Sequence, residues 1–182
     1  SMSNQLLFEA RRGRVWLAKA MAVVLTGVLI AALVWAAYWT GLWAVAETRG
    51  ITTPSDTVTD LVAAGARFTA LGGAVALGGY ALTMLFRSTV GTVGFVFATT
   101  VASYVLLLSL PGTGTQRWLL HQNVFAFVNG SWEYYDPTLC RGAMECDGMT
   151  TLTACPAAAY LAVLLALPVI ASVLSFRRRD VP

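Results

Sequence analysis

The sequence predicts an all-α polytopic membrane protein with four transmembrane helices. Of its 182 residues, 57% are hydrophobic and 12% are charged, and the mean hydropathy is +0.68. A soluble domain carries roughly 25% charged residues. Four apolar runs reach the length of about 20 residues that a bilayer-spanning helix needs, and they cover about 15–45, 61–86, 90–110 and 156–176. We therefore expect a single transmembrane domain over 1–182, located in the cell membrane.

The charges predict how these spans are oriented. Four spans place both chain ends on one side, where eight basic and two acidic residues fall, against four basic and seven acidic residues on the other. A basic excess near span ends marks the cytoplasmic side. Both termini are thus predicted to be cytoplasmic and 111–155 extracellular. The net charge of +3 reflects this topology, and we expect no nucleic-acid partner.

The stretch 6–19, LLFEARRGRVWLAK, places Arg11, Arg12, Arg14 and Lys19 at the start of the first span. Apolar residues alternate with these charges, which is typical of a short amphipathic helix on the inner membrane surface. The same arginines could instead bind lipid headgroups, worth about 1 kcal/mol each. The first span is too long for a cleavable signal peptide, so we expect it to stay in the membrane.

The first two spans carry anchoring and packing signals. Aromatic residues gather at the far end of the first span, as in an interfacial belt, although they could also line a substrate path: Trp35, Tyr38, Trp39 and Trp43. The polar stretch 47–60 contains Pro54, which predicts that the next helix begins near it. The glycines of the second span, such as Gly72 and Gly73, predict close helix packing in lipid.

The remaining spans are linked very differently. Only 87–89 separates the second span from the third, so we expect these two helices to be antiparallel neighbours. The apolar patch 118–128 is too short to span, and we expect one or two short helices there that dip into the outer leaflet. The fourth span begins at Pro156, a favoured first helical residue. Pro168 lies inside it and predicts a kink.

All three cysteines lie in the predicted extracellular segment, where disulfides persist. Three pairings are possible. We favour Cys140 with Cys146, a short loop, and Cys155 is the alternative partner. A zinc site would need four ligands at tighter spacing, and the only histidine, His121, is distant in sequence. No metal site is expected.

The sequence lacks the common catalytic motifs. It contains no phosphate-binding GxxxxGKS loop, no HExxH helix, no GxSxG elbow and no CxxCH haem-attachment site. No spacing pairs a nucleophile with the single histidine. We therefore expect that the chain is not an enzyme and binds no cofactor of its own.

Three stretches, at 1–20, 81–97 and 175–181, give the chain a family likeness. They read SMSNQLLFEARRGRVWLAKA, ALTMLFRSTVGTVGFVF and SFRRRDV. The chain resembles the membrane (permease) subunit of actinobacterial ATP-binding-cassette (ABC) exporters of the short six-span class. The resemblance implies that the four spans are the third to sixth of the family, that the first two are lacking, and that 111–155 holds the paired outer helices.

The same resemblance implies a function and its partners. Residues 1–14 would form the cytoplasmic coupling helix, with Glu9, Arg11, Arg12 and Arg14 contacting an ABC ATPase subunit, and Arg87 would lie at a second contact. ATP and Mg would bind that subunit. Two permease chains, alike or different, would pair in the lipid membrane and export a hydrophobic or amphipathic drug, lipid or peptide. The alternative is a non-transporting anchor or sensor subunit whose extracellular segment binds a partner.

Overall fold

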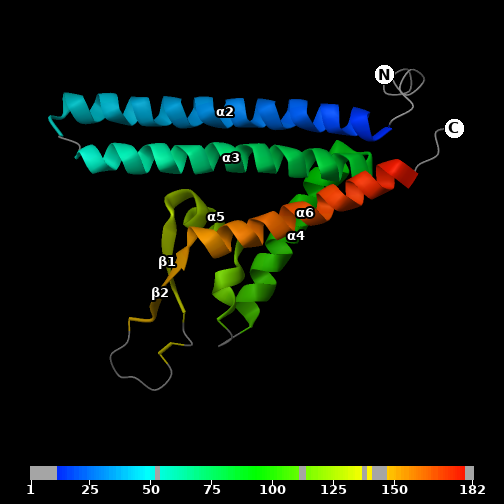
Figure 1. The fold of residues 1–182 in the computed structure, drawn as a ribbon. Coiled ribbons are helices and arrows are strands. Elements are labelled where there is room, and N and C mark those ends of the chain that lie inside the picture. Colours follow the sequence, from blue (N-terminus) through cyan, green and yellow to red (C-terminus); the bar gives the residue numbers. More distant parts are fainter. Residues whose placement is uncertain (1–11, 52–53, 111–113, 137–138, 141–146, 179–182) are drawn as a thin grey trace. The chain divides into compact units, whose positions relative to one another are not determined.

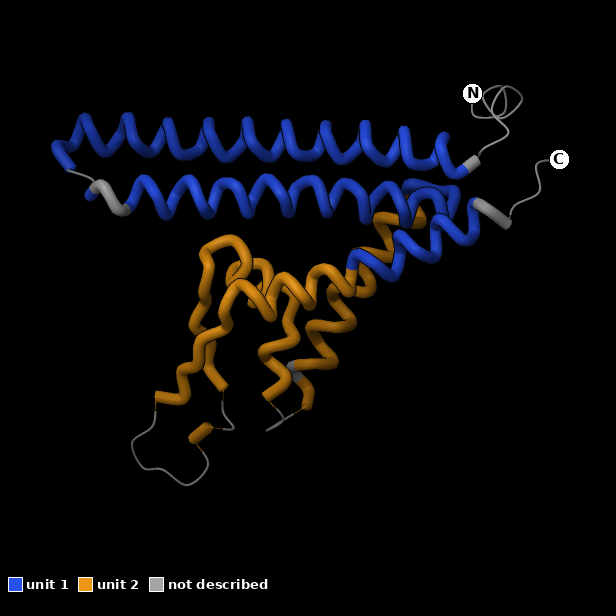
Figure 2. The backbone as a smooth tube through the Cα atoms, viewed as in Figure 1, with its two compact units in different colours: residues 1–89, 165–182 blue, residues 90–164 orange. Residues whose placement is uncertain are grey.

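The computed structural model describes residues 12–51, 54–110, 114–136, 139–140 and 147–178, and its order of elements is shown in Figure 1. Six helices and two strands follow one another in the described residues: α2 (Arg12–Thr48), α3 (Ser55–Phe86), α4 (Thr89–Ser109), the 3-10 helix η1 (Thr115–Trp118), α5 (Leu120–Asn129), β1 (Ser131–Tyr135), β2 (Met149–Thr153) and α6 (Ala154–Arg178). The chain forms two compact units, Ser1–Thr89 with Leu165–Pro182 (unit 1) and Val90–Leu164 (unit 2), which Figure 2 colours separately.

The four predicted spans are confirmed as helices. Four helical segments are long and apolar enough to cross a membrane: Gly13–Thr48, Thr57–Phe86, Thr89–Leu107 and Ala154–Phe176. Their ends differ from the predicted ones by a few residues. The hydrophobic pattern predicts span positions well because every backbone polar group inside a bilayer must be satisfied within the helix itself.

In unit 1, α2 and α3 lie side by side as a helical hairpin (Figure 1). Gly50 has φ 67°, the left-handed conformation that ends many helices. The Ile51 N–H donates to the Ala46 carbonyl at 3.0 Å, which closes the last turn of α2. Pro54 is extended with ψ 146° and precedes the first residue of α3. The prediction that a helix begins near Pro54 is confirmed.

Glycines let the backbones of α2 and α3 approach closely. A Cβ placed on Gly72 would lie 2.5 Å from the Ala31 Cβ, and one placed on Gly27 would lie 2.6 Å from the Ala76 Cβ. Gly73 would meet Val28 at 2.8 Å. Side chains larger than hydrogen do not fit at these positions, so the predicted packing role of Gly72 and Gly73 is confirmed.

Unit 2 contains a feature that the sequence analysis did not predict. β1 and β2 form an antiparallel hairpin in which Trp132 pairs with Leu152 and Glu133 pairs with Thr151. The two short helices η1 and α5 precede it, as predicted, but the expectation of an all-α chain is wrong for these strands. SWEYY and MTTLT are rich in aromatic and β-branched residues, a composition that favours strands, but they lie within a polar, turn-rich segment.

The core of unit 2 lies between α5, the hairpin and the start of α6. Ala126, Tyr134, Leu152 and Ala157 are buried together, with Phe127 packed against them. Next to this core, a buried asparagine orders the turn between η1 and α5. The Asn123 Nδ2 donates to the Arg117 carbonyl at 2.8 Å and to the Leu119 carbonyl at 3.0 Å.

Two sequence predictions about helix geometry stay predictions. Pro168 lies inside α6, which is continuous from Ala154 to Arg178. Because proline lacks an N–H, it removes one hydrogen bond from this helix. The helices α3 and α4 belong to different units, and their packing as antiparallel neighbours is therefore not decided.

The glycine contact between α2 and α3 can be tested directly. Gly72→Ala should lower the free energy of unfolding by about 1–3 kcal/mol, because the new methyl group overpacks the interface. Gly79→Ala is the matched control in the same helix, since nothing lies within 4 Å of a Cβ at this position. Unfolding in detergent, titrated with SDS, measures both, and equal stability of the two variants would contradict the packing role.

Candidate functional site

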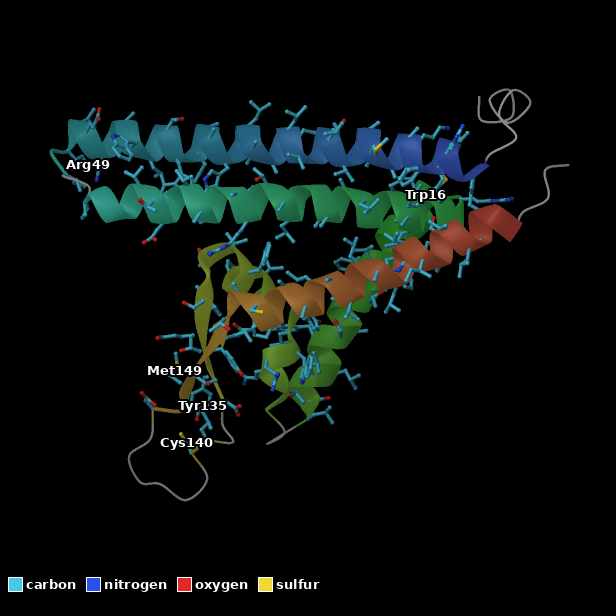
Figure 3. All side chains as sticks on the ribbon, viewed as in Figure 1. Trp16, Arg49, Tyr135, Cys140 and Met149 are labelled. Atoms are coloured by element: carbon cyan, nitrogen blue, oxygen red, sulfur yellow. The ribbon has the colours of Figure 1, made fainter. Side chains whose placement is uncertain are left out.

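The structure places the predicted coupling residues at one end of unit 1. Arg12 and Arg14 belong to the first turn of α2, which runs without interruption into the first span. Arg87 follows the last residue of α3 at the same end of the hairpin. Glu9 and Arg11 lie outside the described residues. Figure 3 shows Trp16 at this end of α2 and Arg49 at the opposite end.

A buried contact joins three helices at this basic end. The indole Nε1–H of Trp16 in α2 donates to the Ser172 Oγ in α6 at 3.2 Å. The ring of Trp16 lies 5.5 Å from the ring of Tyr80 in α3, centroid to centroid. The Tyr80 hydroxyl also reaches the Trp16 carbonyl at 3.5 Å, a long contact. We call Trp16, Tyr80 and Ser172 the tryptophan junction.

Burial makes the tryptophan junction a specific contact. Trp16 is 7% exposed and Ser172 is 1% exposed. An indole N–H buried among apolar groups is costly unless an acceptor is present, so α6 is held where its serine can meet Trp16. Ala20 and Ala81, close in sequence to two of the three residues, are also buried and make room for the large rings.

Arg87 adopts an unusual backbone conformation. Its φ is 54° and its ψ is 18°, and it is the only non-glycine residue with positive φ among those described. Its N–H donates to the Thr83 carbonyl at 2.9 Å, which caps α3. A residue with a Cβ costs roughly 1–2 kcal/mol in this left-handed region, where glycine is usual.

The predicted aromatic belt forms a cluster at the far end of the hairpin. The Trp35 ring lies 5.6 Å from Trp39 and 5.2 Å from Phe68 of α3. A Cβ on Gly65 would approach the Trp35 Nε1 to 2.5 Å, so this glycine lets the indole pack between the helices. Among the described residues, the buried Trp39 Nε1 has no hydrogen-bond acceptor.

The cysteines and the histidine lie in unit 2. Cys155 is a free, exposed thiol, which removes the alternative pairing. Cys146 lies outside the described residues, so the pairing of Cys140 with Cys146 stays a prediction. The His121 ring lies 6.0 Å from that of Tyr104. Within the described ranges, no three His, Cys, Asp or Glu side chains come together to hold a metal ion.

Among the described residues outside the spans, Tyr134 is the one group whose pKa the structure clearly shifts. Burial raises the pKa of its phenol above the usual value of 10.0, and the negative charge of Asp136 raises it further, while Arg117 lowers it. The neutral phenol is therefore favoured in the folded hairpin. Only 8% of this side chain is exposed.

Sequence reasoning did not find the tryptophan junction. Trp16 lies in the stretch 6–19 that is predicted to be amphipathic, and Ser172 lies in the predicted span 156–176, where the sequence indicates no separate role for it. The two residues are 156 positions apart. A tryptophan at the basic start of a span and a serine late in another were the available signals, but many pairings of polar and aromatic residues across four spans are equally compatible with the sequence.

Comparison of the chain with protein-family models, curated proteins and solved structures finds no match.

The hydrogen bond of the tryptophan junction predicts a coupled loss of stability. Ser172→Ala should cost about 0.5–1.5 kcal/mol of unfolding free energy, because the Trp16 N–H loses its acceptor. In a Trp16→Phe background the same substitution should cost almost nothing. Ser103→Ala, an exposed hydroxyl bonded within its own helix, is the control. Additive effects in the double-mutant cycle would exclude the interaction.

The raised pKa of Tyr134 predicts weaker stability at alkaline pH. The contribution is fully present below the unfolded value near pH 10 and is lost as the pH rises through the higher folded pKa. The difference between the unfolding free energies at pH 9 and pH 11 should be smaller in Tyr134→Phe. Tyr135→Phe, an exposed neighbour, should behave like the unmodified chain, and an unchanged pH profile in Tyr134→Phe would contradict the assignment.

Proposed function

We propose that this chain is the permease subunit of an ATP-driven ABC exporter that moves a hydrophobic or amphipathic substrate, such as a drug, lipid or peptide, outward across the cell membrane. Two such chains would pair, and separate ATPase subunits would bind below them. The chain has no GxxxxGKS loop, so ATP and Mg would be bound and used by the partner. The observation that carries the proposal is the tryptophan junction beside the basic residues.

The tryptophan junction could transmit force from a soluble partner. Arg14 is two residues from Trp16, and Arg87 is seven residues from Tyr80. A displacement of the first turn of α2 acts on α3 through the aromatic contact and on α6 through the Trp16–Ser172 hydrogen bond. Arginines bind carboxylates through paired, charge-assisted hydrogen bonds, which suits a contact that must bear such displacement.

The spacing of boundary residues in unit 1 supports an orientation in which its basic end faces the cytoplasm. Lys19 and Trp39 are 20 residues apart in α2, and Arg67 and Arg87 are 20 residues apart in and beyond α3. Both separations correspond to about 30 Å at the helical rise, the thickness of the hydrocarbon core. The Trp35–Phe68 contact puts the two far boundaries at one level. The basic end would then face the cytoplasm.

The helix α4 supports an apolar or amphipathic cargo. It contains no charged residue. Two of its exposed hydroxyls are bonded to their own helix: Thr100 donates to the Val96 carbonyl at 2.8 Å, and Ser103 donates to the Thr100 carbonyl at 2.9 Å. Because these hydroxyls already have hydrogen-bond acceptors, they do not need a charged ligand. An ion path would need intramembrane charges.

A second candidate is the anchor or sensor subunit, in which unit 2 binds an external partner. The stacked pair Phe125 and Trp132, with centroids 4.8 Å apart and an interplanar angle of 25°, favours it. Both side chains are more than a third exposed. Exposed aromatic surface is typical of binding sites.

Charge reversal at the basic end tests the proposal. In Arg12→Glu/Arg14→Glu, the amount of nucleotide-binding subunit that purifies with the chain from its native membranes should fall about tenfold or more, because two charge-assisted contacts are lost. Copurified ATPase is measured by mass spectrometry and by ATP hydrolysis. Arg49→Glu, at the opposite end of α2, should change neither.

Lysine replacements separate coupling from topology and from lipid binding. Arg12→Lys/Arg14→Lys keeps the positive charge that orients the span but loses the planar fork. The exporter proposal expects an intermediate loss of ATPase from this variant, whereas headgroup binding alone expects none. Survival of both ATPase assembly and coupling in the glutamate variant would contradict the exporter and favour the anchor or sensor.

A further inference from the structure

The hydrogen-bond pattern of the hairpin determines which backbone groups of β2 point outward. Ala154 N–H donates to the Gly130 carbonyl at 2.8 Å, and Asp136 N–H donates to the Gly148 carbonyl at 2.8 Å. In an antiparallel pair, hydrogen-bonded and non-hydrogen-bonded residue pairs alternate. The pairs Trp132–Leu152 and Tyr134–Thr150 therefore belong to the hydrogen-bonded set.

The alternate residues of β2 consequently form an open edge. Met149, Thr151 and Thr153 direct their N–H and C=O groups away from β1, and all three residues are exposed. The sheet has only two strands in the part of the chain that the structure describes. The Met149 N–H has a long contact of 3.4 Å to the Asp147 Oδ1.

This edge lacks the devices that normally prevent strand pairing. Edge strands are usually protected by charged side chains, proline or bulges, but MTTLT has no charge and no proline. On β1, by contrast, Glu133 occupies the register position opposite Thr151. The strand β2 is thus the edge of the hairpin that is chemically suited to another strand.

We propose that β2 pairs with β2 of a second copy of this chain, antiparallel about a two-fold axis at Thr151. This inference rests on the proposed function, which pairs two permease chains, and it names a surface at which they meet. Thr151 would pair with Thr151 of the second copy, and Met149 would pair with Thr153. The result is a four-stranded sheet in the order β1–β2–β2–β1.

The edge is compatible with itself in this register. The outward groups of the central pair and of the two flanking pairs would make about six hydrogen bonds. Asp147 would fall opposite Cys155 of the second copy, so the two like charges do not meet. Threonine pairs across strands are favourable, and both central threonines lie on the exposed face of the hairpin. Figure 3 shows Tyr135 and Met149 at the end of the hairpin where β1 ends and β2 begins.

Cysteine crosslinking of the full chain in membranes tests the pairing. Thr151→Cys in a Cys155→Ser background, which removes the free thiol, should give a covalent dimer under mild oxidation. The central Cα atoms would be about 5.5 Å apart, within disulfide range. Glu133→Cys in the same background is the matched control. Its two copies would be three strand spacings apart, about 14 Å, and should give about tenfold less dimer.

A proline variant tests the backbone contribution. In Thr151→Pro, the lost N–H points away from β1, so the hairpin loses no internal hydrogen bond and proline is tolerated on an edge. Light scattering in detergent measures the dissociation constant of the noncovalent dimer. This constant should be about tenfold higher for Thr151→Pro than for the unmodified chain. An unchanged dissociation would overturn the proposal.

The outcomes separate this inference from the proposed function. No dimer from Thr151→Cys, with the ATPase still copurifying, overturns the β2 pairing and leaves the exporter in place. Dimer from Glu133→Cys in place of Thr151→Cys assigns the interface to β1 and overturns the pairing. Crosslinking of Thr151→Cys to a different protein means that the edge receives an external strand, and also overturns it. Dimer from Thr151→Cys without a copurifying ATPase supports the pairing and contradicts the exporter.

Discussion

The close approach of α2 and α3 at their glycines is the contact on which unit 1 depends. Lipid tails are as apolar as leucine, so helices in a bilayer associate through close packing and not through the hydrophobic effect. With only about 2.5 Å between a Cβ on Gly72 and the Ala31 Cβ, the two backbones touch. The contact continues from Trp16–Tyr80 to Trp35–Phe68. The two helices are therefore packed against each other along most of their length.

A polar contact joins α6 to the packed pair of α2 and α3. Close packing already brings α6 against α3, because a Cβ on Gly78 would lie only 3.3 Å from the Leu165 Cδ1, a tight contact. The Trp16–Ser172 hydrogen bond is directional and buried. A shift of α6 by one residue would leave the indole N–H without an acceptor in an apolar environment, which is costly. This bond therefore adds a directional constraint on the register of α6 to the constraint that packing supplies.

The sequence predicted the spans and the packing glycines, because each depends on local composition. It did not predict the junction of Trp16 with Ser172, which depends on which faces of two distant helices meet. Nor did it predict the hairpin. The polar residues around Trp132 and Leu152 indicated turns more strongly than the few aromatic and β-branched residues indicated strands. The short helix α5 was predicted because its apolar patch is continuous in sequence.

Arg87 shows where structure alone does not explain a residue. Its left-handed backbone would be satisfied by glycine at lower conformational cost, yet a long cationic side chain occupies the position. Strain that persists in a short turn indicates a role for the side chain. A positive charge here adds little to the predicted cytoplasmic side, which already carries seven other basic residues. Topology is therefore insufficient to account for Arg87, and its conformation is compatible with the partner contact proposed above.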